Sequence, residues 1–298
     1  MLSQSDRLFF YNGENVNFFP SIGLKLTNKC QYNCPFCCEP DKTPKQYPIS
    51  NFKEIIIRIQ KYGTRRLCLT GGDPLLYPDI GQLLNCSKAL GFYNLLLTSN
   101  GSLLEKKYRE ISPFIDAVRF SVHAMNAKHD EIVGHPGAFA ASSHAIDFLR
   151  RENISCFVTT VVTTLNISDI FDIAEWSFSK GVVRYYMFAL MKSGHGQRFI
   201  DANGVVPQAK MSDIVSALKR KYSKNKMEII YYDYNNNAEC ILIYGDGTIV
   251  IDPYQKSNTF QLVIGNIFSD SQDTIMKNFI KDEDNLNGHR IHLNKHNK

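Results

Sequence analysis

The chain has 298 residues, of which 44% are hydrophobic and 21% are charged, and its formal net charge is +5. This composition is typical of a soluble globular protein, and no apolar run approaches the roughly 18 residues that a transmembrane helix needs. The mild positive charge is spread along the chain, whereas nucleic-acid enzymes typically concentrate it in one stripe. We therefore expect neither a membrane nor a nucleic acid as a partner.

Strand-like apolar runs alternate with helical stretches over the first two thirds of the chain. The expected order is strand 22–27, helix 50–62, strand 65–70, helix 78–91, strand 93–98, helix 102–110, strand 115–122, helix 138–151, strand 155–164, helix 168–180 and strand 182–190. Such alternation implies β-α-β units and a parallel sheet. We expect an α/β fold, a partial (β/α)6 TIM-like barrel. The aromatic segment 1–20 is compatible with an added β-ribbon.

The pattern changes after about residue 195. We expect a barrel domain over 1–195 and a small C-terminal α+β extension over 196–298. A helix is expected at 207–222, because proline suits a first helical position. Alternating β-forming residues around Gly-Asp-Gly predict a β-hairpin between Glu239 and Pro253.

Three of the eight cysteines, at positions 30, 34 and 37, directly follow the first strand in a Cys-x3-Cys-x2-Cys run. Three thiolates on one short loop suit three irons of a cubane cluster and leave the fourth iron open to a small-molecule ligand. Zinc is the competing metal, but no second Cys-x2-Cys knuckle follows. The other thiols are scattered and no signal peptide is seen, so we expect a reducing, cytoplasmic compartment rather than disulfides.

The segment Thr27-Asn28-Lys29-Cys30-Gln31-Tyr32-Asn33-Cys34-Pro35-Phe36-Cys37 resembles the cluster loop of the radical S-adenosylmethionine (SAM) superfamily. Further on, Thr70-Gly71-Gly72-Asp73-Pro74-Leu75 resembles the Gly-Gly-Glu motif, with Asp in place of Glu, and Thr98-Ser99-Asn100-Gly101 resembles the end of the next strand. The resemblance extends from about residue 20 to 195. It implies SAM and one 4Fe-4S cluster as cofactors, with the cluster held by Cys30, Cys34 and Cys37.

The resemblance also assigns side chains to SAM. Gly71, Gly72 and Asp73 would hold its methionine amine, and Phe36 would lie near the adenine. Catalytic loops of such barrels gather at the carboxyl ends of the strands. The candidate cofactor-binding residues all lie at those exits: Phe36, Gly71, Gly72, Asp73, Ser99, Asn100, Ser121 and Asn166.

Two further residues are candidates for catalysis. His123 lies just beyond Ser121 and suits an acid or base, although a structural histidine is an equal alternative. The 239–253 hairpin resembles the SPASM or twitch extension of radical SAM modifiers, but Asp252-Pro253 stands where a second cysteine is expected, so we expect no auxiliary cluster. Cys240 remains, either as a hydrogen-atom donor to a substrate radical or as a buried small hydrophobe.

The function that the resemblance implies is reductive cleavage of SAM, followed by hydrogen abstraction from substrate carbon. We expect the substrate to be a peptide or protein, and the electron donor to be a flavodoxin or ferredoxin. One alternative is modification, such as epimerisation, of a sugar, aminoglycoside or other small metabolite. Another is a non-catalytic metal-binding adaptor.

Overall fold

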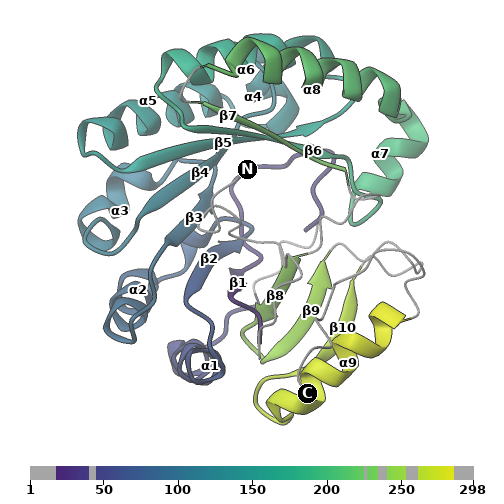
Figure 1. Cartoon of the computed structure of the whole chain (residues 1–298). Coiled ribbons are helices and arrows are strands. Elements are labelled where there is room, and N and C mark those ends of the chain that lie inside the picture. The colour runs from purple at the N-terminus through teal and green to yellow at the C-terminus, as the bar shows by residue number, and fades with distance from the viewer. Residues whose placement is uncertain (1–17, 40–44, 225–226, 234–239, 253–260, 285–298) are drawn as a thin grey trace.

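A computed structural model describes residues 18–39, 45–224, 227–233, 240–252 and 261–284. Its strands form one ten-stranded sheet in the order β10-β9-β8-β1-β2-β3-β4-β5-β6-β7. Seven of them, each parallel to the next, follow the chain: β1 (Ser21–Thr27), β2 (Arg66–Gly71), β3 (Leu95–Ser99), β4 (Ala117–Ser121), β5 (Ser155–Val162), β6 (Arg184–Ala189) and β7 (Glu228–Tyr232). Figure 1 shows them curving into an open barrel wall.

Helices cover the outer face of the sheet, apart from the helix at 196–203, which lies at the strand exits (Figure 1). They are α1 (Ile49–Tyr62), α2 (Ile80–Ala89), α3 (Leu104–Ile111), α4 (Asn126–Val133), α5 (Ala138–Arg151), α6 (Ile170–Ser179), α7 (Gly196–Asn203), α8 (Gln208–Tyr222) and α9 (Gln272–Asp284), with short 3-10 turns η2 (Pro74–Leu76) and η3 (Ile167–Asp169). In α1 the buried residues Phe52, Ile55, Ile56 and Ile59 recur at helical spacing and face the sheet. Full burial of each such side chain stabilises the fold by about 1.5–3 kcal/mol.

The C-terminal hairpin belongs to the same sheet. β8 (Cys240–Tyr244) lies parallel to β1, with Leu242 opposite Gly23, and β9 (Thr248–Asp252) and β10 (Leu262–Asn266) follow antiparallel. The close approach of β8 requires glycine at position 23, since an added Cβ there would lie 2.4 Å from the Leu242 side chain. Within the described residues, β10 and β7 are the two ends of the sheet, so the barrel is open.

The structure confirms the expected α/β fold with a parallel sheet. It adds a seventh parallel strand, β7, and the short helices α4 and α7, which the sequence pattern did not predict. Segments of five to eight residues carry too few turns or alternations to produce a clear period. The expected β-ribbon at 1–20 lies mostly outside the described residues, and the division of the chain at residue 195 stays a prediction.

Alternate residues of the strands face the inside of the barrel. A small inner cluster holds Cys68, Leu96, Ala117, Phe157 and Tyr186, separate from the large core beneath the helices. Arg119 lies over the Tyr186 ring, 5.7 Å from its centroid, and Arg184 lies 5.1 Å from that of Phe157. Both arginines therefore line the barrel interior, which the strand pattern alone did not establish.

Candidate active site

The three clustered cysteines lie on the loop that follows β1, which we call the cluster loop (residues 28–39). Cys30, Cys34 and Cys37 are each partly exposed. Between them, Tyr32 and Phe36 are 5% and 6% exposed and pack in a small cluster with Ala124, Ile132, Val133, Ala138 and Phe199. The aromatic side chains thus anchor the loop while the sulfurs stay accessible.

The start of the cluster loop is held by the exit of β2. The Gly72 amide donates to the Thr27 carbonyl and the Asp73 amide to the Lys29 carbonyl, both at 2.8 Å. Added Cβ atoms on Gly71 and Gly72 would lie 2.2 Å from the Thr27 oxygen and 2.1 Å from the Lys29 oxygen. The two glycines are needed because backbone packs directly on backbone here.

The Asp73 side chain is fully buried within a hydrogen-bond network. Its carboxylate accepts from the Leu75 amide at 3.0 Å, from the Ser99 hydroxyl at 3.1 and 3.2 Å, and from Gln31 Nε2 at 3.3 Å. Burial raises the pKa of Asp73, and these hydrogen bonds oppose the rise. Asp73 is therefore a structural centre that links β2, β3 and the cluster loop.

Gln31 extends this network to the next predicted cofactor residue. Its Nε2 donates to Asn100 Oδ1 at 3.0 Å and also to the Ser102 hydroxyl. Its other amide atom, Oε1, is buried and has no hydrogen-bond partner in the described structure. Such an orphaned acceptor beside the cluster loop suits the ammonium group of a bound ligand.

The donors around Cys30 also suit a cluster-bound thiolate. The Tyr32 amide lies 3.4 Å and Asn100 Nδ2 lies 3.8 Å from the Cys30 sulfur. Among the described residues, no three His, Cys, Asp or Glu side chains converge closely enough to hold one metal ion. A cubane presents separate iron corners, so its thiolates need not converge on one point.

The end of the cluster loop is held by the segment before α7. The His195 amide donates to the Cys37 carbonyl at 2.9 Å. Gly194 has φ +57°, and an added Cβ would lie 2.5 Å from the Cys37 oxygen and 2.6 Å from the Cys38 oxygen. The glycine-rich turn after β6 therefore packs onto the cluster loop.

His123 is buried beneath the cluster loop. Its ring makes an edge-on contact with Phe36 at 4.9 Å between centroids, its Nδ1 accepts from the Val161 amide at 3.3 Å, and its own amide donates to His129 Nδ1 at 3.0 Å. Burial, with a smaller contribution from His129, lowers the pKa of His123 to about 3. We therefore favour a neutral packing role that supports Phe36, in place of the expected acid or base role.

The two remaining strand-exit residues differ in accessibility. Ser121 ends β4 and is partly exposed. Asn166 is fully buried, and its amide is engaged with the backbone of the β5 exit: Nδ2 donates to the Val161 carbonyl at 2.9 Å, and Oδ1 accepts from the Thr163 amide at 2.8 Å. Asn166 shapes the turn, and direct contact with SAM stays a prediction for both Ser121 and Asn166.

Cys240 does not lie at the exits of the parallel strands. It is the first residue of β8, and the register that pairs Leu242 with Gly23 places it level with Ser21, at the opposite end of β1 from the cluster loop. It packs against the inner cluster, and burial raises the pKa of its thiol. We favour the packing role for Cys240 over the expected hydrogen-donor role.

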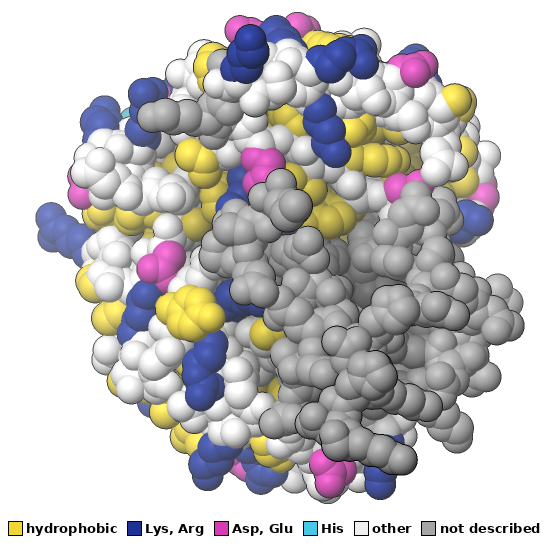
Figure 2. Space-filling model, viewed as in Figure 1, with side chains coloured by type: hydrophobic (Ala, Val, Ile, Leu, Met, Phe, Trp, Pro, Cys, Tyr) yellow, Lys and Arg dark blue, Asp and Glu magenta, His cyan; other side chains and the backbone are white. Residues whose placement is uncertain are grey.

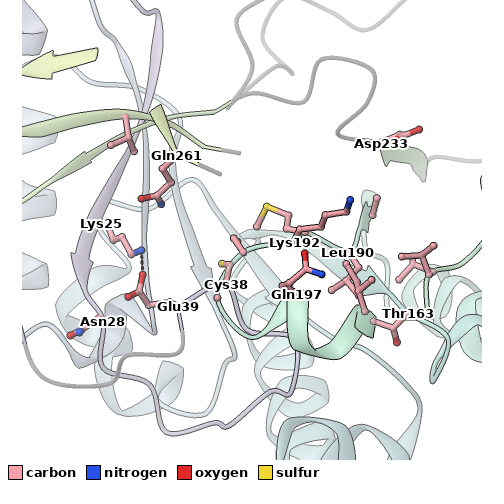
Figure 3. A pocket seen from close by; sticks show the side chains of 18 of the residues that line it. Lys25, Asn28, Cys38, Glu39, Thr163, Leu190, Lys192, Gln197, Asp233 and Gln261 are labelled. Atoms are coloured by element: carbon pink, nitrogen blue, oxygen red, sulfur yellow. Dashed lines mark hydrogen bonds and ion pairs between the residues drawn. The ribbon is translucent and has the colours of Figure 1, made fainter. Parts of the chain in front are cut away.

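A cavity of about 1460 Å3 opens beside the end of the cluster loop. One wall is polar and comes from β1, the cluster loop and the C-terminal hairpin; it includes Lys25, Asn28, Glu39 and Gln261. The opposite wall comes from the exits of β5 and β6 and from α7 and α8. Its apolar members include Leu190, Met191, Ile200, Val205, Val206 and Met211. Figure 3 shows Cys38 between the two walls, and Figure 2 shows apolar side chains gathered beneath α6 and α8.

Sequence reasoning missed several residues of this site. Lys25, in an otherwise apolar strand, is only 9% exposed and forms an ion pair with Glu39. A single charge within a buried strand is the signal that marks it. Gln31 carries no comparable signal, because its contacts are with residues distant in the sequence. The Gly194-His195-Gly196 run marks a turn, but it does not reveal the contact of that turn with the cluster loop.

Relatives with the same pattern support the assignment. The chain is 28% identical over 181 residues to an AdoMet-dependent heme synthase of Methanosarcina barkeri, which covers 59% of this chain and 52% of the relative. It is 26% identical over 181 residues to the sporulation killing factor maturation protein SkfB of Bacillus subtilis, which covers 59% and 44% respectively. The chain thus spans about half the length of these curated relatives.

The fold is similar to that of Streptococcus suis SuiB bound to its precursor peptide SuiA, with a TM-score of 0.67, 12% identity, and coverage of 78% of this chain and 59% of SuiB. The sequence model of the radical SAM superfamily matches residues 24–177, which are 154 of the 298 residues. The chain therefore belongs to the radical SAM superfamily, and this membership implies SAM and a 4Fe-4S cluster as its cofactors.

Proposed function

We propose that this protein is a radical SAM enzyme that abstracts hydrogen from a carbon atom of a peptide or protein substrate. When bound, the cluster supplies one electron that cleaves SAM and yields a 5′-deoxyadenosyl radical, which abstracts the hydrogen. The electron would come from a flavodoxin or ferredoxin. Cys30, Cys34 and Cys37 would hold the cluster.

The chain's own residues would position the reactants. The Gly71-Gly72-Asp73 segment packs on the start of the cluster loop, and Gln31 directs its unpaired Oε1 toward a ligand ammonium group. The His123 ring packs edge-on against Phe36, and Phe36 would support the adenine. A rigid frame of this kind lowers the entropy cost of bringing reacting atoms together.

The observation that carries the choice of substrate is the charge balance of the cavity. Its described lining holds three lysines, Lys25, Lys45 and Lys192, and three carboxylates, Glu39, Asp233 and Asp246. A polyphosphate or other polyanion favours a cationic wall, and these charges cancel. Apolar side chains on one wall, together with charges of both signs around the cavity, suit a peptide with mixed side chains. SuiB, which shares the fold, was solved with a peptide.

None of the helices in the described residues is both long and apolar enough to cross a membrane.

A small metabolite is the competing substrate. One relative of this chain is named a heme synthase, and heme is a small molecule.

The test begins with anaerobic reconstitution with iron and sulfide. We expect about four irons per chain and, on reduction with dithionite, formation of 5′-deoxyadenosine from SAM. Candidate peptides encoded beside the gene, and candidate metabolites, are then incubated in deuterated solvent and analysed by mass spectrometry. A peptide mass change that requires SAM supports the proposal, and a change confined to a metabolite replaces it. A protein that binds zinc or no metal, and cleaves no SAM, would be an adaptor.

A further inference from the structure

Lys25 is a buried cation on the inner face of β1. The residue is 9% exposed, although transfer of an unpaired ammonium group from water into a protein interior is costly. Burial alone would lower the pKa of Lys25, but Tyr244 and Glu39 outweigh it, and the pKa is raised. Lys25 therefore stays charged, held by its neighbours rather than by water.

Its anionic partner lies at the end of the cluster loop. The Glu39 carboxylate, 21% exposed, forms an ion pair with Lys25 Nζ, drawn as a dashed line in Figure 3. Glu39 is also close to the third cysteine, since it follows Cys37 by two residues and accepts a hydrogen bond from the free Cys37 thiol at its carbonyl, at 3.1 Å. A cluster-bound cysteine is a thiolate and cannot donate, so a displacement of Glu39 would be transmitted to the Cys37 sulfur through the backbone that joins the two residues.

On its other side, Lys25 reaches the C-terminal hairpin. Its Nζ lies 3.5 Å from the Tyr244 hydroxyl and 5.0 Å from the centroid of that ring. Gln261 Nε2 then donates to the Tyr244 hydroxyl at 2.9 Å and to Asp252 at 3.0 Å. One polar chain thus runs from the cluster loop across β1 and β8 to β9 and the start of β10.

We propose that Lys25 is a positioning residue for the cluster: through Glu39 and Tyr244 it fastens the end of the cluster loop to the C-terminal hairpin and sets the place of the Cys37 sulfur. The inference rests on the proposed cluster and goes beyond it. It gives the hairpin a function, since residues some 200 positions along the chain support one of the three ligands.

The experiment measures cluster retention rather than turnover. Reconstituted wild type, Lys25→Met, Glu39→Gln and the double variant are mixed anaerobically with a ferrous chelator, and the rate of iron release is followed by absorbance. Each single variant removes one member of the part-buried ion pair, so we expect release to accelerate about tenfold. In the double variant, the acceleration of iron release is expected to be smaller than the product of the two single accelerations, because the two residues act as a pair.

Matched variants separate positioning from general stability. Lys192→Met removes another lysine of the cavity lining and is expected to leave release unchanged. Lys25→Arg keeps the charge and is expected to restore at least half of the wild-type retention. Thermal unfolding of the metal-free proteins is measured in parallel. The electron paramagnetic resonance spectrum of the reduced cluster is expected to change in Lys25→Met and to return toward wild type in Lys25→Arg.

If Lys25→Met does not fold, Tyr244→Phe provides the test, because it removes only the hydroxyl and is expected to accelerate release about two- to threefold. Release within twofold of wild type in both Glu39→Gln and whichever of these two variants folds overturns the inference and leaves the cluster in place. An equal acceleration in Lys192→Met also overturns it. A wild type that takes up no iron removes the proposed function and this inference together.

Discussion

The two ends of the cluster loop are held in different ways. Its start rests on the neighbouring strand exit, where the amides of Gly72 and Asp73 donate to the carbonyls of Thr27 and Lys29. Its end is held by an ion pair to Lys25 and by the His195 amide, from elements far away in the chain. Backbone contacts of the first kind require glycine and leave a motif in the sequence, whereas side-chain contacts of the second kind leave scattered residues.

Substitution of Gly72 by alanine should break the first end. The new Cβ would lie 2.1 Å from the Lys29 oxygen. Lys29 directly precedes Cys30, so its backbone cannot move without shifting that cysteine. We expect the anaerobically reconstituted variant to hold less than about one tenth of the wild-type iron. The overlap is with backbone atoms, so no flexible side chain can move aside to relieve it. Gly91→Ala is the control, because open space surrounds Gly91 and only its φ of +82° adds strain. Wild-type iron in Gly72→Ala would show that the contact is dispensable.

Substitution of Gly194 by alanine should loosen the second end. Both the φ of +57° and the 2.5 Å approach to the Cys37 oxygen oppose a side chain there. Left-handed strain alone costs about 1–2 kcal/mol, so we expect iron release to a chelator to accelerate at least about fivefold. Gly63→Ala adds left-handed strain at φ +112° in open space, and it should release iron at the wild-type rate. Equal rates for the two variants would contradict a contact specific to the loop.

Two buried histidines should make the stability of the protein depend on pH. His123 contacts Phe36, in the middle of the cluster loop, and His129 contacts His123. Burial lowers the pKa of His123 to about 3 and of His129 to about 4 from an ordinary 6.5, so both are neutral when folded. The unfolded chain binds more protons below pH 6.5, and stability is therefore lost as pH falls from 6.5 toward 4. We expect the metal-free protein to be roughly 4 kcal/mol less stable at pH 5 than at pH 7.5.

Urea unfolding at several pH values measures this loss. His129→Gln removes one of the two groups and should reduce the pH dependence by about half. An unchanged slope in that variant would mean that other groups dominate.

Substitution of Asp73 by asparagine should weaken the contacts at the start of the cluster loop without creating a steric overlap. The amide nitrogen cannot accept hydrogen bonds, so at least one of the donors on Leu75, Ser99 and Gln31 would lose its partner. We expect a loss of about 1–3 kcal/mol in the free energy of unfolding, measured with urea on the metal-free protein. Ser99→Ala, which removes one donor and leaves the carboxylate, should cost less. A larger loss in Ser99→Ala would place the centre of the network elsewhere.

Substitution of Cys240 by alanine should affect neither end. Its place level with Ser21 leaves it away from the strand exits, and loss of a small, partly buried side chain costs about 1 kcal/mol or less. Iron content and SAM cleavage should match the wild type, as measured by iron assay and by 5′-deoxyadenosine formation. A loss of substrate product with normal SAM cleavage would instead restore the hydrogen-donor role.

Much of the fold could be predicted from the residue pattern. Each of the six predicted strands appears within two residues of its expected bounds, because buried parallel strands are apolar runs separated by amphipathic helices. β7 was missed, since Glu228–Tyr232 is a short segment whose partner strand, β6, lies some 40 residues earlier. Pairing supplies the stability that such a segment lacks by itself.

The sequence by itself determined the chemistry of the site: three thiols on one loop, two glycines where backbone meets backbone, and a strand order that brings the exits together. Only the tertiary structure decided which side chains serve that loop. It gave His123 and Asn166 hydrogen bonds to the backbone of the β5 exit, placed Cys240 level with the opposite end of β1, and joined Lys25 to Glu39 and Tyr244. Local steric needs can be read along the chain, whereas a charge pair across the sheet exists only after folding has brought its members together.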